Sequence, residues 1–312
     1  MPKAKAKRRS KAPSAKPAFA LWTLVLLLIG GSLIGTGLWW FYVQHHITPQ
    51  QLLNRLLGKS TAPTIVVTIP EGFNRFDIAE RLQTLKVCDA QEFIRWTENK
   101  NLLKQLDIHA PHAEGYLFPD TYHLFQPTPA RQVITRMVKH WQSQMLGLAN
   151  VQPEGLATLH QELGWQLHEV LTLASIVEKE AALQREQATI AGVFLNRLRF
   201  DSFSPKRLQA DPTVSYGCLQ GPKVSTACEN FDGQSISKAM LNDRANPYNT
   251  YVIEKLQPGP ISNPGLSAIK AVLAPQQHRF LYFVACPGRM HVFSESLSQH
   301  NRAVSRCRSR MP

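Results

Sequence analysis

Two glutamates separated by one residue, Glu178 and Glu180, are the side chains of this 312-residue chain best placed for acid–base chemistry. They lie near the end of a helix predicted over about 164–182, where apolar residues recur with helical spacing. On a helical wheel Glu180 lies at one margin of a broad apolar sector, near Leu173, and Glu178 lies at the other, near Leu167. A carboxyl at such a border is partly desolvated. Its pKa therefore rises toward the value that a general acid needs near neutral pH.

The wheel leaves alternatives open. It does not choose between the two glutamates, and it is also compatible with a structural interpretation in which both are charges at the helix rim. One of them would then pair with Lys179 or a nearby arginine. The remaining face of the helix is predicted to be polar and carries His168, Thr172, Ser175 and Lys179.

The first 44 residues predict a membrane anchor. Seven of the 35 basic residues fall in the first 16 positions, and no charged residue occurs in 17–44. About 20 apolar residues at 1.5 Å each cross a bilayer core of ~30 Å, so we predict a basic cytoplasmic tail (1–16), a transmembrane helix (17–44) and a connector (45–63). A cleavable signal peptide is the alternative, but its apolar region is usually shorter, and no Ala-x-Ala site follows Val43. A nucleic-acid-binding protein would more often carry its charge on the folded domain.

Cysteine and histidine spacing predicts no metal site and no cofactor. Five cysteines are too few for a disulfide scaffold, although the outer compartment permits pairing. Cys218 and Cys228 are the favoured pair because they are close in sequence, and an odd count leaves at least one cysteine over. His109 and His112 form an HxxH pattern, but Pro111 lies between them and disrupts helical presentation.

The rest of the chain is predicted to be α+β. A β-branched run at 64–69 indicates a strand, and a helix over 73–87 and one or two helices over 90–106 follow it. These elements form a small α+β module at 64–110. A further helix around 129–146 opens a larger domain at 111–312, which contains both glutamates.

The run LASIVEKE at 173–180 resembles the signature of the endolytic murein transglycosylases, the YceG-like family. Seven other stretches match that family in the expected order. They are EGYLFPDTY (114–122), VFLNRL (193–198), LQADPTVSYG (208–217), PYNTY (247–251), LQPGPISNPG (256–265), YFVA (282–285) and HVFSESLSQHN (291–301).

The resemblance implies a membrane-anchored lytic transglycosylase of cell-wall biogenesis. Such an enzyme cuts the β-1,4 bond between N-acetylmuramic acid and N-acetylglucosamine inside peptidoglycan strands and leaves 1,6-anhydro-muramyl ends. The short segment between the membrane exit and residue 64 would hold the cleft near the membrane, which suits cutting of nascent strands, and elongation is expected to end with the cut. The resemblance places the catalytic domain (111–312) outside the bacterial inner membrane, after a LysM-like module (64–110). The implied partners are glycan strands and peptidoglycan synthases or division machinery, without nucleic acid.

Within the signature, the family's acid corresponds to Glu180, and Glu178 becomes a supporting residue. One carboxyl suffices for this reaction because the attacking group, the muramic C6 hydroxyl, belongs to the substrate. A hydrolytic muramidase is the nearest rival and would need a second carboxylate, for which Asp211 is the best candidate.

Motif position predicts further polar residues of the cleft. Asn and Gln amides suit N-acetyl groups, and Tyr rings stack on sugars while their hydroxyls donate. Asn263 is predicted to cap a helix that begins at Pro264. The residues predicted to line the cleft are Gln209, Asp211, Tyr216, Tyr248, Asn249, Tyr251 and Glu114.

Two departures from the family pattern affect these expectations. The connector is only about 20 residues long, which keeps the cleft near the membrane, and 199–207 resembles an insertion. A non-catalytic glycan-binding or scaffold protein of the cell-wall machinery remains the alternative function. A buried unpaired acid, which costs stability, argues against it.

Overall fold

The computed structural model describes residues 64–220 and 225–309, which form a mixed, mostly helical α+β structure. The predicted tail (1–16), transmembrane helix (17–44) and connector (45–63) lie outside the described residues. Within the described ranges, no helix is long and apolar enough to cross a membrane.

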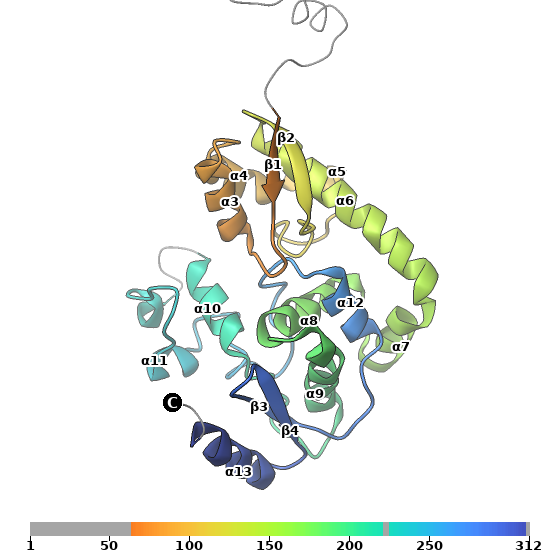
Figure 1. Ribbon diagram of the computed structural model, residues 1–312, viewed down its shortest axis with the longest axis vertical. Coiled ribbons are helices and arrows are strands. Elements are labelled where there is room, and N and C mark those ends of the chain that lie inside the picture. Colours follow the sequence, from red (N-terminus) through yellow and green to blue (C-terminus); the bar gives the residue numbers. More distant parts are fainter. Residues whose placement is uncertain (1–63, 221–224, 310–312) are drawn as a thin grey trace, which may run out of the picture. The chain divides into compact units, whose positions relative to one another are not determined.

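An antiparallel pair of strands organises the N-terminal part. Strand β1 (Thr64–Thr68) pairs with β2 (Thr121–Phe125), and Val67 lies opposite Tyr122. Three short helices lie between the strands, and a long helix follows β2 (Figure 1). Their bounds are α3 (Arg75–Thr84), α4 (Ala90–Thr97), α5 (Lys100–Gln105) and α6 (Ala130–Val151).

The strand at the start of this module and its following helices agree with the sequence prediction. Side chains of Asn74, Asp89 and Asn99 accept hydrogen bonds from the first turns of α3, α4 and α5, which explains where each helix begins. The sheet, however, joins residues on both sides of the boundary predicted at 110/111. A lone β1 would leave an unpaired edge, and the strand that satisfies it comes from beyond that boundary.

Helix α8 (Leu167–Glu180) packs against α9 (Gln187–Arg199) and α12 (Leu266–Leu273), and α7 (Pro153–Leu163) precedes it (Figure 1). The predicted polar face of α8 is wrong at Thr172 and Ser175, which are buried. The loop before α12 covers this face, and Ser175 Oγ accepts a hydrogen bond from the Ile261 amide at 3.0 Å. Helix α8 is therefore enclosed over most of its length, and its C-terminal end carries Glu180.

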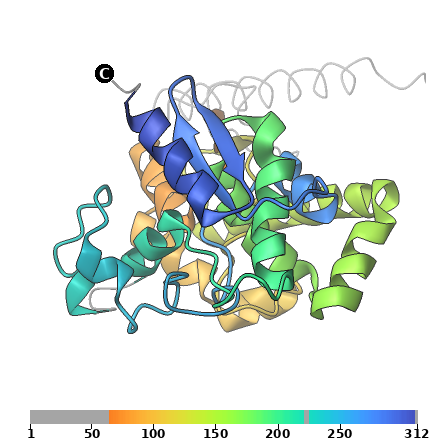
Figure 2. The same ribbon diagram turned by 90° about the horizontal axis from the view of Figure 1, so that it is seen from below.

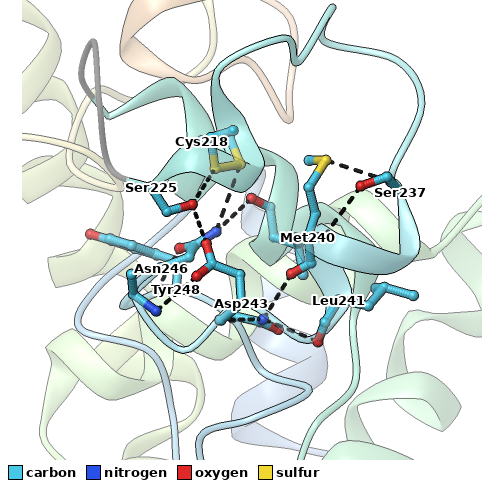
Figure 3. Close-up of a disulfide and its surroundings, with 12 residues drawn as sticks. Cys218, Ser225, Ser237, Met240, Leu241, Asp243, Asn246 and Tyr248 are labelled. Carbon is cyan, nitrogen blue, oxygen red and sulfur yellow. Dashed lines mark hydrogen bonds between the residues drawn. A yellow bond between two sulfur atoms is a disulfide. The ribbon is translucent and has the colours of Figure 1, made fainter.

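A loop-rich region surrounds α10 (Asp211–Leu219) and α11 (Lys238–Leu241). A disulfide joins Cys218 to Cys228, as proximity in sequence predicted (Figure 3). Near it, Asn246 Nδ2 donates to the Val214 carbonyl at 3.0 Å, which ties the loop back to α10.

The C-terminal part is a β-hairpin with a helix beside it (Figure 2). Strand β3 (Tyr282–Cys286) pairs antiparallel with β4 (Met290–Ser294), and α13 (Leu297–Arg308) packs on both strands. A second disulfide, Cys286–Cys307, fastens the helix to the hairpin. Among the described cysteines, Cys88 forms no disulfide.

Candidate active site

A cavity of about 520 Å³ lies where α8 ends and faces α9, the start of α10 and the β3–β4 hairpin. Its polar and aromatic lining includes both predicted and unpredicted residues. They are Glu180, Arg197, Gln209, Asp211, Tyr251, Tyr282, His291 and His300.

Glu180 is the last residue of α8, and its partly buried carboxyl lies at the wall of this cavity. Burial raises the pKa of Glu180 to about 7, the negative charge of Asp211 adds to the rise, and Arg197 opposes it. Within the described part of the chain, no group donates a hydrogen bond to this carboxyl. Glu180 is thus partly protonated near neutral pH and has no hydrogen-bond donor among the described residues, which suits a general acid.

Arg197 supplies a buried positive charge to the same cavity, and no functional role was predicted for it. Its Nε donates to the Leu281 carbonyl at 2.7 Å, and its Nη1 donates to the Leu208 carbonyl. Its guanidinium lies 5.5 Å from the ring centre of Phe203. Burial lowers the pKa of Arg197 to about 10, and it stays charged at neutral pH. The only sequence signal was its place in the VFLNRL stretch.

The segment before α10 is held so that Gln209 and Asp211, two of the residues predicted for the cleft, line this cavity. Thr250 accepts two hydrogen bonds from this segment. Its carbonyl accepts from the Gln209 amide at 3.1 Å, and its side-chain hydroxyl accepts from the Ala210 amide at 2.9 Å. Gln209 adopts a left-handed backbone with φ of 53°, which is uncommon for a residue other than glycine and concentrates at functional sites. The Tyr251 hydroxyl donates to Asp211 Oδ1 at 2.5 Å, which brings a third predicted residue to the cavity.

His291 also lines the cavity, although its sequence stretch predicted no role for it. Its Nδ1 lies 2.7 Å from Glu186 Oε2, and its amide donates to Glu186 Oε1 at 3.2 Å. The side chains of His291 and Glu186 are only 5% and 12% exposed, so this pair is well shielded from water. The carboxylate fixes the orientation of the imidazole, and the other ring nitrogen has no hydrogen-bond partner among the described residues.

The prediction that Glu114 lines the cleft is wrong, because its side chain is fully enclosed away from the cavity. It accepts hydrogen bonds from the Arg75 amide at 2.9 Å, the Tyr216 hydroxyl at 2.9 Å and Asn263 Nδ2 at 2.7 Å. Burial raises the pKa of Glu114 to about 7, while the hydrogen bond from the Arg75 amide, the Arg75 charge and the Tyr216 hydroxyl oppose the rise. We call this cluster of Arg75, Glu114, Tyr216 and Asn263 the buried hub.

Tyr216, Tyr248 and Asn249 are also absent from the cavity lining, contrary to prediction. Tyr216 belongs to the buried hub, and the Tyr248 hydroxyl lies 3.4 Å from Nε2 of buried His112. Asn249 Nδ2 donates to three carbonyls, those of Met240, Leu241 and Asp243, and shapes the loop after α11. Tyr248 and Asn249 directly precede Thr250 and Tyr251 in sequence, so their contacts help to fix the segment that reaches the cavity.

The predicted helix cap at Asn263 is also wrong, since α12 begins at Leu266 after an N-cap at Gly265. Asn263 instead accepts from the Gly115 and Leu117 amides at 2.9 Å with its side-chain oxygen. Glu178 accepts from the Gly265 amide at 3.2 Å, a contact consistent with the supporting role predicted for it.

Metal ligation finds no support around the histidines of the HxxH pattern. His109 pairs with Asp107 at the surface, while His112 is buried beside Tyr248. Across 64–220 and 225–309, no three His, Cys, Asp or Glu side chains gather as metal ligands would.

The chain is similar to a known protein family and to several known proteins. Residues 31–306 match the YceG-like family. A Bacillus subtilis protein named endolytic murein transglycosylase is 28% identical over 269 residues, which cover 81% of this chain and 68% of that protein. A Streptococcus pneumoniae protein of the same name is 27% identical and covers 85% of this chain, which spans only 50% of the relative.

A solved structure shows the same likeness. The crystal structure of a yceG-like protein from Listeria monocytogenes superposes with a TM-score of 0.61 at 31% identity. The match covers 81% of this chain and 80% of that one.

Proposed function

The chain belongs to the YceG-like family, and from this premise we propose that it is a lytic transglycosylase that cuts peptidoglycan strands internally. One observation carries the proposal. Glu180, whose carboxyl lies at the cavity wall without a hydrogen-bond donor among the described residues, is the second glutamate of the LASIVEKE stretch. The relatives named endolytic murein transglycosylase support the same reaction class.

In the proposed reaction, protonated Glu180 donates its proton to the glycosidic oxygen while the bond from that oxygen to muramic C1 breaks. The sugar passes through an oxocarbenium-like state. The Glu180 carboxylate then takes the proton of the muramic C6 hydroxyl, whose oxygen bonds to C1 and closes the 1,6-anhydro ring. Glu180 returns to its acid form, and no water is consumed.

The neighbouring groups suit this cycle. The negative charge of Asp211 raises the pKa of Glu180 and would stabilise positive charge developing on the sugar. The exposed Gln209 side chain offers an amide donor and acceptor for an N-acetyl group at the same cavity.

We further propose that 17–44 anchors the enzyme in the inner membrane, with the N-terminus in the cytoplasm and the cavity outside. The charge pattern of the first 44 residues supports this orientation. An anchored cavity would act on nascent strands beside peptidoglycan synthases, and the module that begins at β1 would contribute LysM-like glycan contacts.

Product mass distinguishes this function from its rivals. The full chain in detergent micelles is incubated with purified peptidoglycan, and soluble fragments are weighed by mass spectrometry. We expect 1,6-anhydro-muramyl ends, and Asp211→Asn should retain them. Ends roughly 18 Da heavier, lost in Asp211→Asn, would instead establish a hydrolase with two carboxylates. A folded chain that binds glycan without cutting it would establish the scaffold function.

A further inference from the structure

A second cavity, of about 590 Å³, lies at the opposite end of α8 from Glu180. Its walls come from the end of α7, the first turns of α8, the end of α9 and the segment 253–258. His168 lines this cavity, and twelve residues of helix at 1.5 Å each separate it from Glu180 by about 18 Å. The volume falls within the range of about 300–1,000 Å³ that is usual for small-molecule sites.

Most polar side chains of this second cavity already have protein partners. His168 bonds the Tyr116 hydroxyl at 2.9 Å and the Pro258 carbonyl at 3.1 Å. Lys206 donates to Asp201 at 3.2 Å, and Glu254 accepts from Arg207 at 3.2 Å. The charges of Lys206 and Glu254 are therefore compensated, while Lys255 lies exposed at the same cavity.

Among the buried polar side chains that line this cavity in the described residues, Gln257 is the exception. It lines the cavity and is only 3% exposed, yet neither its side-chain oxygen nor its side-chain nitrogen has a hydrogen-bond partner among the described residues. A buried amide without partners costs about 1–3 kcal/mol for each unsatisfied group, and native proteins rarely retain one without a reason. A bound group that offers both an acceptor and a donor would satisfy it.

The remaining lining residues are mostly apolar, which suits a ligand ring that has one apolar face. Trp165 lines the cavity beside Leu163, Leu198, Ile253 and Leu256. An indole face among aliphatic side chains suits the apolar face of a sugar, whose N-acetyl group carries the secondary amide that Gln257 would pair with.

We propose that this second cavity is a subsite for an N-acetylated amino sugar of the glycan strand, distant from the bond that is cut. The choice of glycan rests on the proposed function. Binding at a remote subsite would hold a strand in register, and its binding energy would serve the reaction at Glu180. One loop connects the two cavities, because Tyr251 lines the first and Ile253 lines the second.

The test uses the full chain carrying Glu180→Gln, so that no strand is cut, and tri-N-acetylchitotriose as the probe. Binding is followed by the change in tryptophan fluorescence. The part of this change that is lost in Trp165→Phe is the contribution of Trp165 in the second cavity. We expect saturable binding that weakens about tenfold or more in Gln257→Met, which loses the amide pair. The melting temperature should not fall, because Gln257→Met removes two unpartnered buried atoms. Gln187→Met is the matched control, since Gln187 is a buried glutamine with an unpartnered oxygen outside both cavities.

Equal binding by Gln257→Met and its parent would overturn the proposal. So would Gln257-dependent binding of a free stem peptide without binding of chitotriose, because the amide recognised would then be a peptide bond. Peptidoglycan cleavage by the chain that retains Glu180 is measured separately. If peptidoglycan is cleaved but chitotriose binding does not depend on Gln257, only the subsite proposal is wrong. If binding depends on Gln257 but no peptidoglycan is cleaved, only the proposed transglycosylase function is wrong.

Discussion

Glu114 in the buried hub and Glu180 in the active-site cavity are both glutamates whose pKa burial raises to about 7, but their carboxyls have different neighbours. Glu114 accepts from Arg75, Tyr216 and Asn263 and is fully enclosed. Glu180 has no donor among the described residues and lies at a cavity wall.

The contrast shows that a raised pKa alone does not identify a catalytic acid. Burial raises the pKa of both carboxyls, but the hydrogen bonds of Glu114 occupy its oxygens and stabilise the fold. Only the other keeps its proton available to a bound molecule. The hub connects residues from the N-terminal module with α10 and the loop before α12, so its carboxyl serves stability.

Replacing each carboxyl by an amide tests the different roles of Glu180 and Glu114. Glu180→Gln should lower the rate of anhydro-end formation about 10²–10⁴-fold, the usual share of a general acid, and leave the melting temperature nearly unchanged. Glu114→Gln should lower the melting temperature, because its new NH₂ group meets donors, and keep the rate per folded molecule. A large rate loss in folded Glu114→Gln would reverse the two roles.

The second prediction concerns the hub alone. Asn263→Ala removes the donor to Glu114 and the acceptor of two amides, which leaves buried groups unpaired. We expect a loss of about 3 kcal/mol in the free energy of unfolding. Urea denaturation measures it, and Asn242→Ala, a change at an exposed asparagine, is the control. Stability equal to that of the control would show that the hub does not hold the fold.

A smaller effect is expected within the cavity, where Glu186 holds His291. Glu186→Gln keeps an acceptor but removes the charge that orients the imidazole, so kcat/KM should fall about tenfold or less, with little change in stability. Glu162→Gln, which breaks the ion pair with Arg199 outside the cavity, is the matched control. If both variants behave alike, His291 has no positioning role in the reaction.

Local pattern predicted much of this molecule. The first strand, the helices that follow it and the helix bearing Glu180 arise from short-range periodicity and capping residues, which a sequence displays directly. Glu180, Gln209, Asp211 and Tyr251 were found because they stand in stretches that resemble a known family, and the structure brings all four to one cavity.

The incorrect or missing predictions share one cause. The role of a polar residue depends on contacts with residues that are distant in sequence. Glu114, Tyr216 and Asn263 lie far apart in sequence and meet only in the fold. Strand β2 was missed because its pairing with β1 spans more than fifty residues. His291 could have been selected only by knowing that Glu186, from another element, lies beside it.

The most direct test of the central claim is the pH dependence of anhydro-end formation by the full chain. Protonated Glu180 is the active form, so the rate should be constant below pH about 7 and fall tenfold per pH unit above it. Asp211→Asn removes the charge that raises the pKa of Glu180, so the fall should begin at lower pH. A rate that stays unchanged from pH 6 to 9, or a fall that Asp211→Asn does not move, would contradict the assignment of Glu180 as the acid.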